Sequence, residues 1–141
     1  MRKYYLFVVK KEFSRVYRNN AETLYKTLEN LYKTKSKNFN YGIALYNQLC
    51  LPFNVDILTN YFDHQSSMKK NKNKYFYRNK SEVVYFKINY SCCQIVTNMN
   101  LPSVLKVFDY YSKDIFVCDF ENRDYFWLTN QYNKKRIYEY N

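Results

Sequence analysis

The spacing of hydrophobic residues changes along the chain, from mainly helical early on to mainly strand-like later. Residues 3–9 are β-branched or aromatic almost throughout, which predicts a central strand covered on both faces. Residues 53–63, after the helix-ending Pro52, fit either a helix or an extended segment, and we favour a short helix. Three further segments carry hydrophobic residues at helical spacing and are predicted as helices: 10–17, 21–33 and 38–50.

Beyond residue 64 the pattern becomes that of a sheet. Apolar residues almost disappear over 65–74, which predicts a solvated loop. A helix is predicted from about residue 100 to 111, and period-two alternation predicts strands at 75–77, 84–90, 95–96, 115–120 and 125–128. Early helices and late antiparallel strands indicate an α+β fold with a mostly antiparallel sheet packed with helices. We expect one domain over residues 1–129 and a polar C-terminal tail over 130–141.

The amino-acid composition excludes some classes of binding site. The chain has 141 residues, a length typical of one domain, and its only glycine is Gly42. Dinucleotide-binding and Walker-type loops need several glycines so that the backbone can approach phosphate, and this chain cannot form them. We therefore expect no nucleotide cofactor, and the search for other chemistry rests on acidic, histidine and cysteine side chains.

The formal net charge of +11, from 23 basic and 12 acidic residues, has two explanations of about equal weight. It can attract phosphate, anionic lipid or an acidic protein. It can also follow from A/T-rich codons, which raise the number of Lys, Asn, Tyr, Phe and Ile together. No apolar run approaches the ~18 residues that span a bilayer, and the run after Met1 is short for a signal peptide. The sequence predicts a cytoplasmic protein with no membrane partner.

Catalytic and metal-binding candidates are weak. Asp119, Glu121 and Asp124 form the one acidic cluster, which fits a Mg²⁺-dependent nuclease but is more typical of a polar hairpin turn. His64 has no nucleophile pattern around it and is predicted to lie at the surface. The cysteines have neither disulfide-framework nor zinc-site spacing, and adjacent Cys92 and Cys93 point to opposite faces of a strand. We predict no catalytic, cofactor-binding or metal-binding residue and no enzymatic activity.

Two aromatic groups are candidates for binding. Residues Lys69 to Lys80 place Tyr75, Phe76 and Tyr77 among six basic residues, a composition that suits single-stranded nucleic acid. A solvated lysine loop followed by an ordinary aromatic strand explains the same segment, and we favour that explanation, so direct nucleic-acid contact is an alternative function.

Phe13 and Tyr17 form the second group. They are four residues apart in the predicted first helix and therefore share a face. Val16 competes with them for the inward position. Spacing alone gives equal weight to a core role and to a protein-partner interface, in which Phe and Tyr are enriched.

These aromatic residues also carry a family resemblance. The segment from Lys3 to Tyr17 (KYYLFVVKKEFSRVY) resembles the opening of SirA, the sporulation inhibitor of replication protein of endospore-forming bacteria. The segment from Ile115 to Leu128 (IFVCDFENRDYFWL) is similar to that family's closing hairpin, an Asp-Phe, a short turn and then Tyr-x-Trp-Leu. The two blocks keep the family's order and cover roughly a fifth to a quarter of the chain.

The resemblance implies a small protein that acts without catalysis. Family members bind the N-terminal domain I of the replication initiator DnaA and so block replication initiation. Their contacts include the Phe and Tyr after the opening strand, which match Phe13 and Tyr17, and we expect these two to form an exposed aromatic ridge. Where family members carry a glycine after this Tyr, the present chain has Arg18-Asn19-Asn20, and asparagine can adopt the same left-handed turn.

Overall fold

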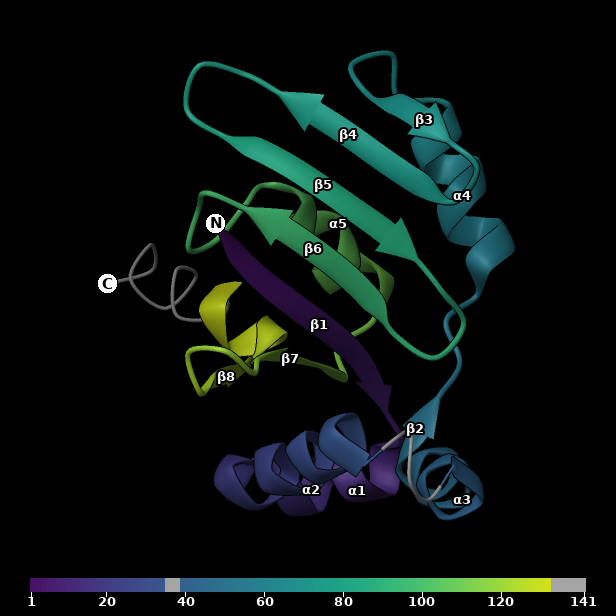
Figure 1. Ribbon diagram of the computed structural model, residues 1–141, viewed down its shortest axis with the longest axis vertical. Helices are drawn as coiled ribbons and strands as arrows, with labels where there is room; N and C mark the ends of the chain where they lie inside the picture. The colour runs from purple at the N-terminus through teal and green to yellow at the C-terminus, as the bar shows by residue number, and fades with distance from the viewer. Residues whose placement is uncertain (35–38, 133–141) are drawn as a thin grey trace.

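One antiparallel sheet organises the chain (Figure 1). The computed structural model describes residues 1–34 and 39–132, together with their side chains except those of 34 and 39–43. Its strands are β1 (Arg2–Val9), β2 (Cys50–Leu51), β3 (Lys69–Asn71), β4 (Lys74–Arg78), β5 (Val83–Ile88), β6 (Cys93–Thr97), β7 (Ile115–Asp119) and β8 (Asp124–Trp127). Its helices include α1 (Lys11–Tyr17), α2 (Ala21–Thr34), α3 (Phe39–Leu49), α4 (Val55–Asp63) and α5 (Val104–Tyr111). The predicted α+β class is confirmed.

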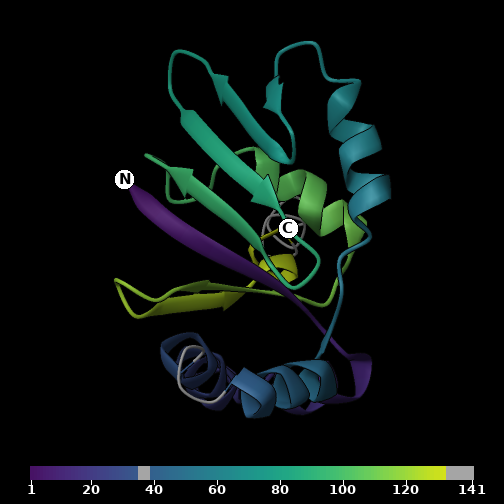
Figure 2. The ribbon, with the colours of Figure 1, turned by 45° about the vertical axis from the view of Figure 1, so that its right-hand side comes forward.

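Strand β1 lies at the centre, as its continuous hydrophobic run predicted. The strand order is β3-β4-β5-β6-β1-β7-β8, and β2 pairs with the end of β1. Alternate side chains of β1 enter two separate cores, with Leu6 in one and Phe7 in the other. The first core lies between the sheet and helices α4 and α5. The second lies under α2 and α3, which Figure 2 shows at the β1–β7 end of the molecule.

Aromatic rings fill much of the first core. The Phe62 ring of α4 lies 4.7 Å from that of Phe86 on β5 and 6.0 Å from that of Phe108 on α5. All three side chains are buried. Ring pairs at these separations add to the stabilisation that comes from burying their area. The high Phe and Tyr content of the sequence is therefore in part a structural feature.

The structure corrects two local predictions. Residues Lys69–Asn71, expected within a solvated loop, form the edge strand β3, because backbone pairing with β4 needs no apolar side chain. Lys72, with φ of 59°, makes the tight turn between them. Asn19 and Asn20 do not adopt the left-handed conformation, which in the described residues occurs only at Lys72 and Arg123. Instead the Asn20 side chain accepts a 2.9 Å hydrogen bond from Thr23 in α2.

The chain continues beyond β8 as a helical segment over 128–132. Leu128 is buried in the first core, and Tyr132 packs against that core. The remainder of the predicted polar tail, residues 133–141, lies outside the described residues. Within the described ranges, none of the helices has both the length and the apolar character needed to cross a lipid bilayer.

A buried carboxylate closes the first turn of α5. Glu82 accepts hydrogen bonds from the backbone N–H of Ser103 at 3.1 Å and from its hydroxyl, and Tyr77 joins the same network. Burial by itself raises the pKa of Glu82, but these donors outweigh burial and hold the pKa below its ordinary value. The ionised form therefore stabilises the fold above the unfolded-state pKa, and this contribution is lost as the pH falls through the folded-state value.

We expect Glu82→Gln to lower the free energy of unfolding by about 1.5–3 kcal/mol at neutral pH, the contribution of hydrogen bonds to a charged group. Because wild-type Glu82 also loses its charge in acid, the difference between the two proteins should shrink below about pH 4. Urea unfolding of both proteins across this pH range measures the effect. A difference that does not change with pH would show that the charge of Glu82 does not stabilise α5.

Candidate protein-interaction site

Helix α1 follows β1 after a single residue and is fixed at its inner side by polar contacts. Ser14, the only buried residue of α1, donates from Oγ to Asp114 Oδ1 at 2.9 Å. Arg18, just after the helix, donates to the same carboxylate at 3.3 Å and to the Lys113 carbonyl at 2.7 Å. These partners lie about a hundred residues away in the sequence, so local spacing gave no signal for them. They set the rotation of α1 about its axis.

The β7–β8 hairpin holds the C-terminal end of α1. The Trp127 indole Nε1–H donates to the Tyr17 carbonyl at 3.2 Å, and the Arg18 guanidinium lies 4.4 Å from the centre of the indole ring. Trp127 is itself buried and packs edge-on against Phe116 at 4.9 Å. The end of α1 is therefore positioned by a residue of the last strand.

This rotation settles which residues of α1 face outward. Phe13 and Tyr17 are half-buried and pack against the second core, so the exposed ridge predicted from the sequence is only partly exposed. Val16 did not take the inward position and is 64% exposed. Glu12 and Arg15 are also exposed. The outer surface of α1 is thus an apolar strip, Val16 with the free edges of Phe13 and Tyr17, between charged residues.

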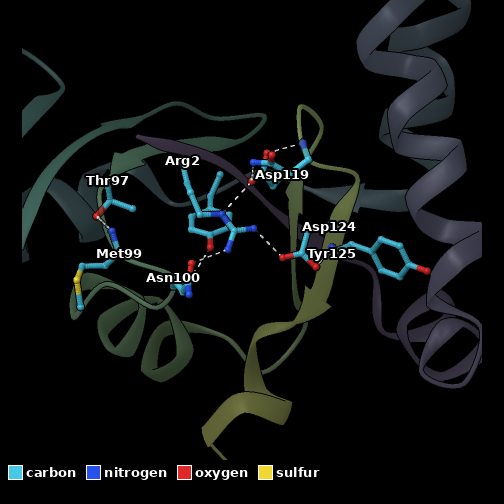
Figure 3. A network of polar contacts seen from close by, with 9 residues as sticks. Arg2, Thr97, Met99, Asn100, Asp119, Asp124 and Tyr125 are labelled. Atoms are coloured by element: carbon cyan, nitrogen blue, oxygen red, sulfur yellow. Dashed lines mark hydrogen bonds and ion pairs between the residues drawn. The ribbon is translucent and has the colours of Figure 1, made fainter.

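Two residues of the acidic cluster at the hairpin, Asp119 and Asp124, form ion pairs with Arg2. Figure 3 shows the Arg2 guanidinium between Asp119, which accepts from Nε at 3.1 Å, and Asp124, which accepts from Nη2 at 2.7 Å. Arg2 Nη1 also donates to the Asn100 side chain at 3.0 Å. Both aspartates therefore share this one guanidinium, which offsets one of their two negative charges. In the part of the chain that the structure describes, this cluster included, no three His, Cys, Asp or Glu side chains converge as metal ligands would.

The other candidate nucleophiles are placed as surface or core residues. His64 is exposed at the end of α4, where its Nδ1 lies 2.6 Å from the Asn60 carbonyl. Cys50, Cys93 and Cys118 are buried free thiols. Burial raises the pKa of the Cys50 thiol to about 12, so it stays protonated at neutral pH.

The basic aromatic segment does not present its three aromatic rings together. Tyr75 and Tyr77 point into the first core, and only Phe76 lies on the opposite face of the sheet. Lys70 pairs with Asp63 at 2.8 Å, beside the Tyr75 hydroxyl that donates to the same carboxylate. Three consecutive rings therefore do not form one stacking platform, because adjacent residues of a strand face opposite ways.

The two blocks that carry the family resemblance form one unit in the structure. Strand β1 pairs with β7 from Tyr5↔Cys118 to Val8↔Ile115, and β7 pairs with β8. The blocks also meet at Arg2 and at Trp127, as described above. Comparison of the chain with known protein families and with curated proteins finds no match in either.

Proposed function

We propose that this chain is a non-enzymatic cytoplasmic inhibitor of replication initiation that binds the N-terminal domain I of DnaA, with a link to sporulation. The family resemblance supplies the partner. The observation that supports it most is the contact between the resembling blocks: the closing hairpin bonds to the C-terminal end of α1, the helix that carries Phe13 and Tyr17. Residues far apart in the sequence thus act together to present one helix.

The geometry of α1 suits binding with little loss of conformational freedom. Contacts of Ser14, Arg18 and Trp127 fix the helix before a partner arrives. The rings of Phe13 and Tyr17 are already half-packed, so a partner has fewer rotamers to restrict. Val16 adds an exposed apolar residue beside them. A central aromatic and apolar strip with a charged rim is the usual composition of a protein interface.

The direct test is titration calorimetry with domain I of DnaA from the source organism. We expect Phe13→Ala combined with Tyr17→Ala to weaken binding by about 30-fold or more, because aromatic anchors of this kind are worth about 2 kcal/mol or more. Both rings also contact the second core, so this variant is expected to lose some stability. A second variant must therefore separate binding from folding.

Val16→Glu provides this separation. The side chain is mostly exposed, so its replacement should change the free energy of unfolding by only about 0.5 kcal/mol. A charge on the exposed side of the apolar strip, next to the aromatic rings, should nevertheless abolish binding. Tyr61→Ala, an exposed tyrosine on the distant helix α4, is the matched control and should bind like wild type. Undiminished binding by a folded Val16→Glu protein and by the double alanine variant would overturn the proposal, as would no binding by wild type.

A further inference from the structure

Over strands β3 to β6, the face of the sheet opposite the first core has no cover from any described helix. In Figure 1 the strands β3 to β6 are seen from this face, while α4 and α5 lie behind them. Figure 2 gives the same arrangement from a second direction. The side chains that alternate with the first-core residues of these strands therefore project away from both cores. We call this surface the open face.

The register of the sheet places aromatic residues at the centre of the open face. Residues directly opposite each other in antiparallel pairs share a face. One row of opposite residues crosses five strands of the sheet. It runs from Lys69 on β3 through Phe76 on β4, Tyr85 on β5 and Val96 on β6 to Lys3 on β1. The Phe76 and Tyr85 rings lie 4.6 Å apart with 34° between their planes, and Tyr85 is 49% exposed. The row is thus a ring pair and a valine with a lysine at each end.

The neighbouring positions add positive charge without any balancing acid. Lys74 lies directly opposite Lys87, and Arg78 lies on the other side of Phe76. Like charges in such a pair destabilise a sheet. No Asp or Glu occurs in β3, β4, β5 or β6. Within the described residues, none of these cations forms an ion pair; they are Lys3, Lys69, Lys74, Arg78 and Lys87.

Two simpler explanations do not account for this arrangement. Codon composition raises the number of lysines, but it does not remove every acid from four adjacent strands. Protection of a sheet edge from pairing with another chain, a common role of lysines, explains Lys69 on the edge strand β3. Edge protection does not explain Lys87 or Lys3, which lie on the interior strands β5 and β1. The opposed pair of Lys74 and Lys87, on the interior strands β4 and β5, favours a ligand that supplies negative charge.

We propose that the open face binds single-stranded nucleic acid, with phosphates at the lysines and bases stacked on Phe76 and Tyr85. Sequence-tolerant single-strand binding combines a basic track with exposed aromatic rings, as found here. A duplex keeps its bases stacked inside and offers nothing to the rings. An acidic peptide would match the charge but not the ring pair. At ordinary strand spacing the row from Lys69 to Lys3 is roughly 19 Å long, enough for a few nucleotides.

The test is fluorescence anisotropy with the full chain and labelled mixed-sequence oligomers of about 20 nucleotides, one DNA and one RNA, with a DNA duplex and polyglutamate as competitors. We expect binding to at least one single strand that weakens steeply from about 50 to about 200 mM salt. The two oligomers distinguish DNA from RNA as the source of the same chemistry. Neither the duplex nor polyglutamate should bind the protein as tightly as the single strand does.

Variants separate the rings from the charges. Phe76→Ala combined with Tyr85→Ala should weaken binding about ten-fold or more, whereas Tyr85→Phe, which keeps the ring, should retain it. Lys3→Gln combined with Lys87→Gln should reduce the slope of log affinity against log salt by about 0.7 for each phosphate that is no longer neutralised. Tyr110→Ala and Lys106→Gln, exposed positions on α5 behind the sheet, are the matched controls and should behave like wild type.

Several results would overturn the proposal. These are no binding to either oligomer at low salt, equal binding of the duplex or of polyglutamate, and an affinity that the ring variants leave unchanged. The proposal does not depend on DnaA binding. Val16→Glu on α1 should keep its oligonucleotide affinity, and the ring variants should keep any affinity for domain I.

Discussion

Replacing Asp119 with alanine is expected to lower the free energy of unfolding by about 3–5 kcal/mol, the cost of breaking a buried ion pair from one side. The Asp119 side chain is fully buried and accepts hydrogen bonds from Arg2 Nε at 3.1 Å and from Asn122 Nδ2 at 2.7 Å. Without the carboxylate, Arg2, whose side chain is only 25% exposed, loses one of its two anionic partners, and the exposed Asn122 loses its acceptor. Urea unfolding followed by the fluorescence of Trp127, the only tryptophan, measures the loss.

Asp124→Ala is the matched control for this prediction. Asp124 binds the same guanidinium at 2.7 Å, but its side chain is 48% exposed. Exposed ion pairs contribute about 1 kcal/mol or less, so the control should be nearly neutral. In the double variant with Arg2→Ala, the cost of Asp119→Ala should fall, because the two residues share one interaction. Equal costs for Asp119→Ala and Asp124→Ala would contradict the structural role of the buried pair.

The parts of the fold that the sequence predicted are those set by local periodicity. Residues 3–9 are apolar on both faces, and β1 does enter two cores. Residues 53–63 fit either a helix or an extended segment, and the favoured helix is present as α4. The Asn54 side chain caps it by accepting from the Ile57 N–H at 3.1 Å. Period-two alternation at 84–90 likewise predicted a strand where the structure has β5. In each case the signal lies within a few neighbouring residues.

The parts that the sequence did not predict depend on contacts between distant segments. The rotation of α1 follows from Ser14 and Arg18 meeting Asp114, and spacing within the helix carries no information about that contact. The acidic cluster looked like a metal site or a plain turn because Arg2, its partner, lies at the other end of the chain. Hydrophobic pattern cannot reveal either.

The open face shows the same limit. Lys69 to Lys80 attracted attention as a continuous stretch, yet two of its three rings face the core. Tyr85, Lys87 and Lys3 complete the surface from other strands, and only the register brings them to Phe76. A binding surface on a sheet is built from alternate residues of several strands. A search along one segment therefore finds at most part of it.

Replacing Trp127 with alanine is expected to lower the free energy of unfolding by about 3–5 kcal/mol and to weaken binding at α1 as well. The buried indole fills the space between Phe116 and the Arg18 guanidinium. Its loss leaves a cavity at the junction of the hairpin and the helix, and it removes the hydrogen bond to the Tyr17 carbonyl. Thermal unfolding followed by circular dichroism measures stability, and calorimetry with domain I measures binding.

Trp127→Phe distinguishes the packing of the indole from its hydrogen bond. Phenylalanine keeps most of the apolar volume but cannot donate to Tyr17, whose carbonyl retains the backbone N–H of Asn20 at 3.1 Å. The loss of stability should therefore be about 0.5–1.5 kcal/mol, the net value of one hydrogen bond. If Trp127 positions α1 for its partner, Trp127→Phe should weaken binding more than an equally destabilising core change elsewhere, such as Ile88→Val on β5. Equal binding by these two variants would restrict Trp127 to a role in stability.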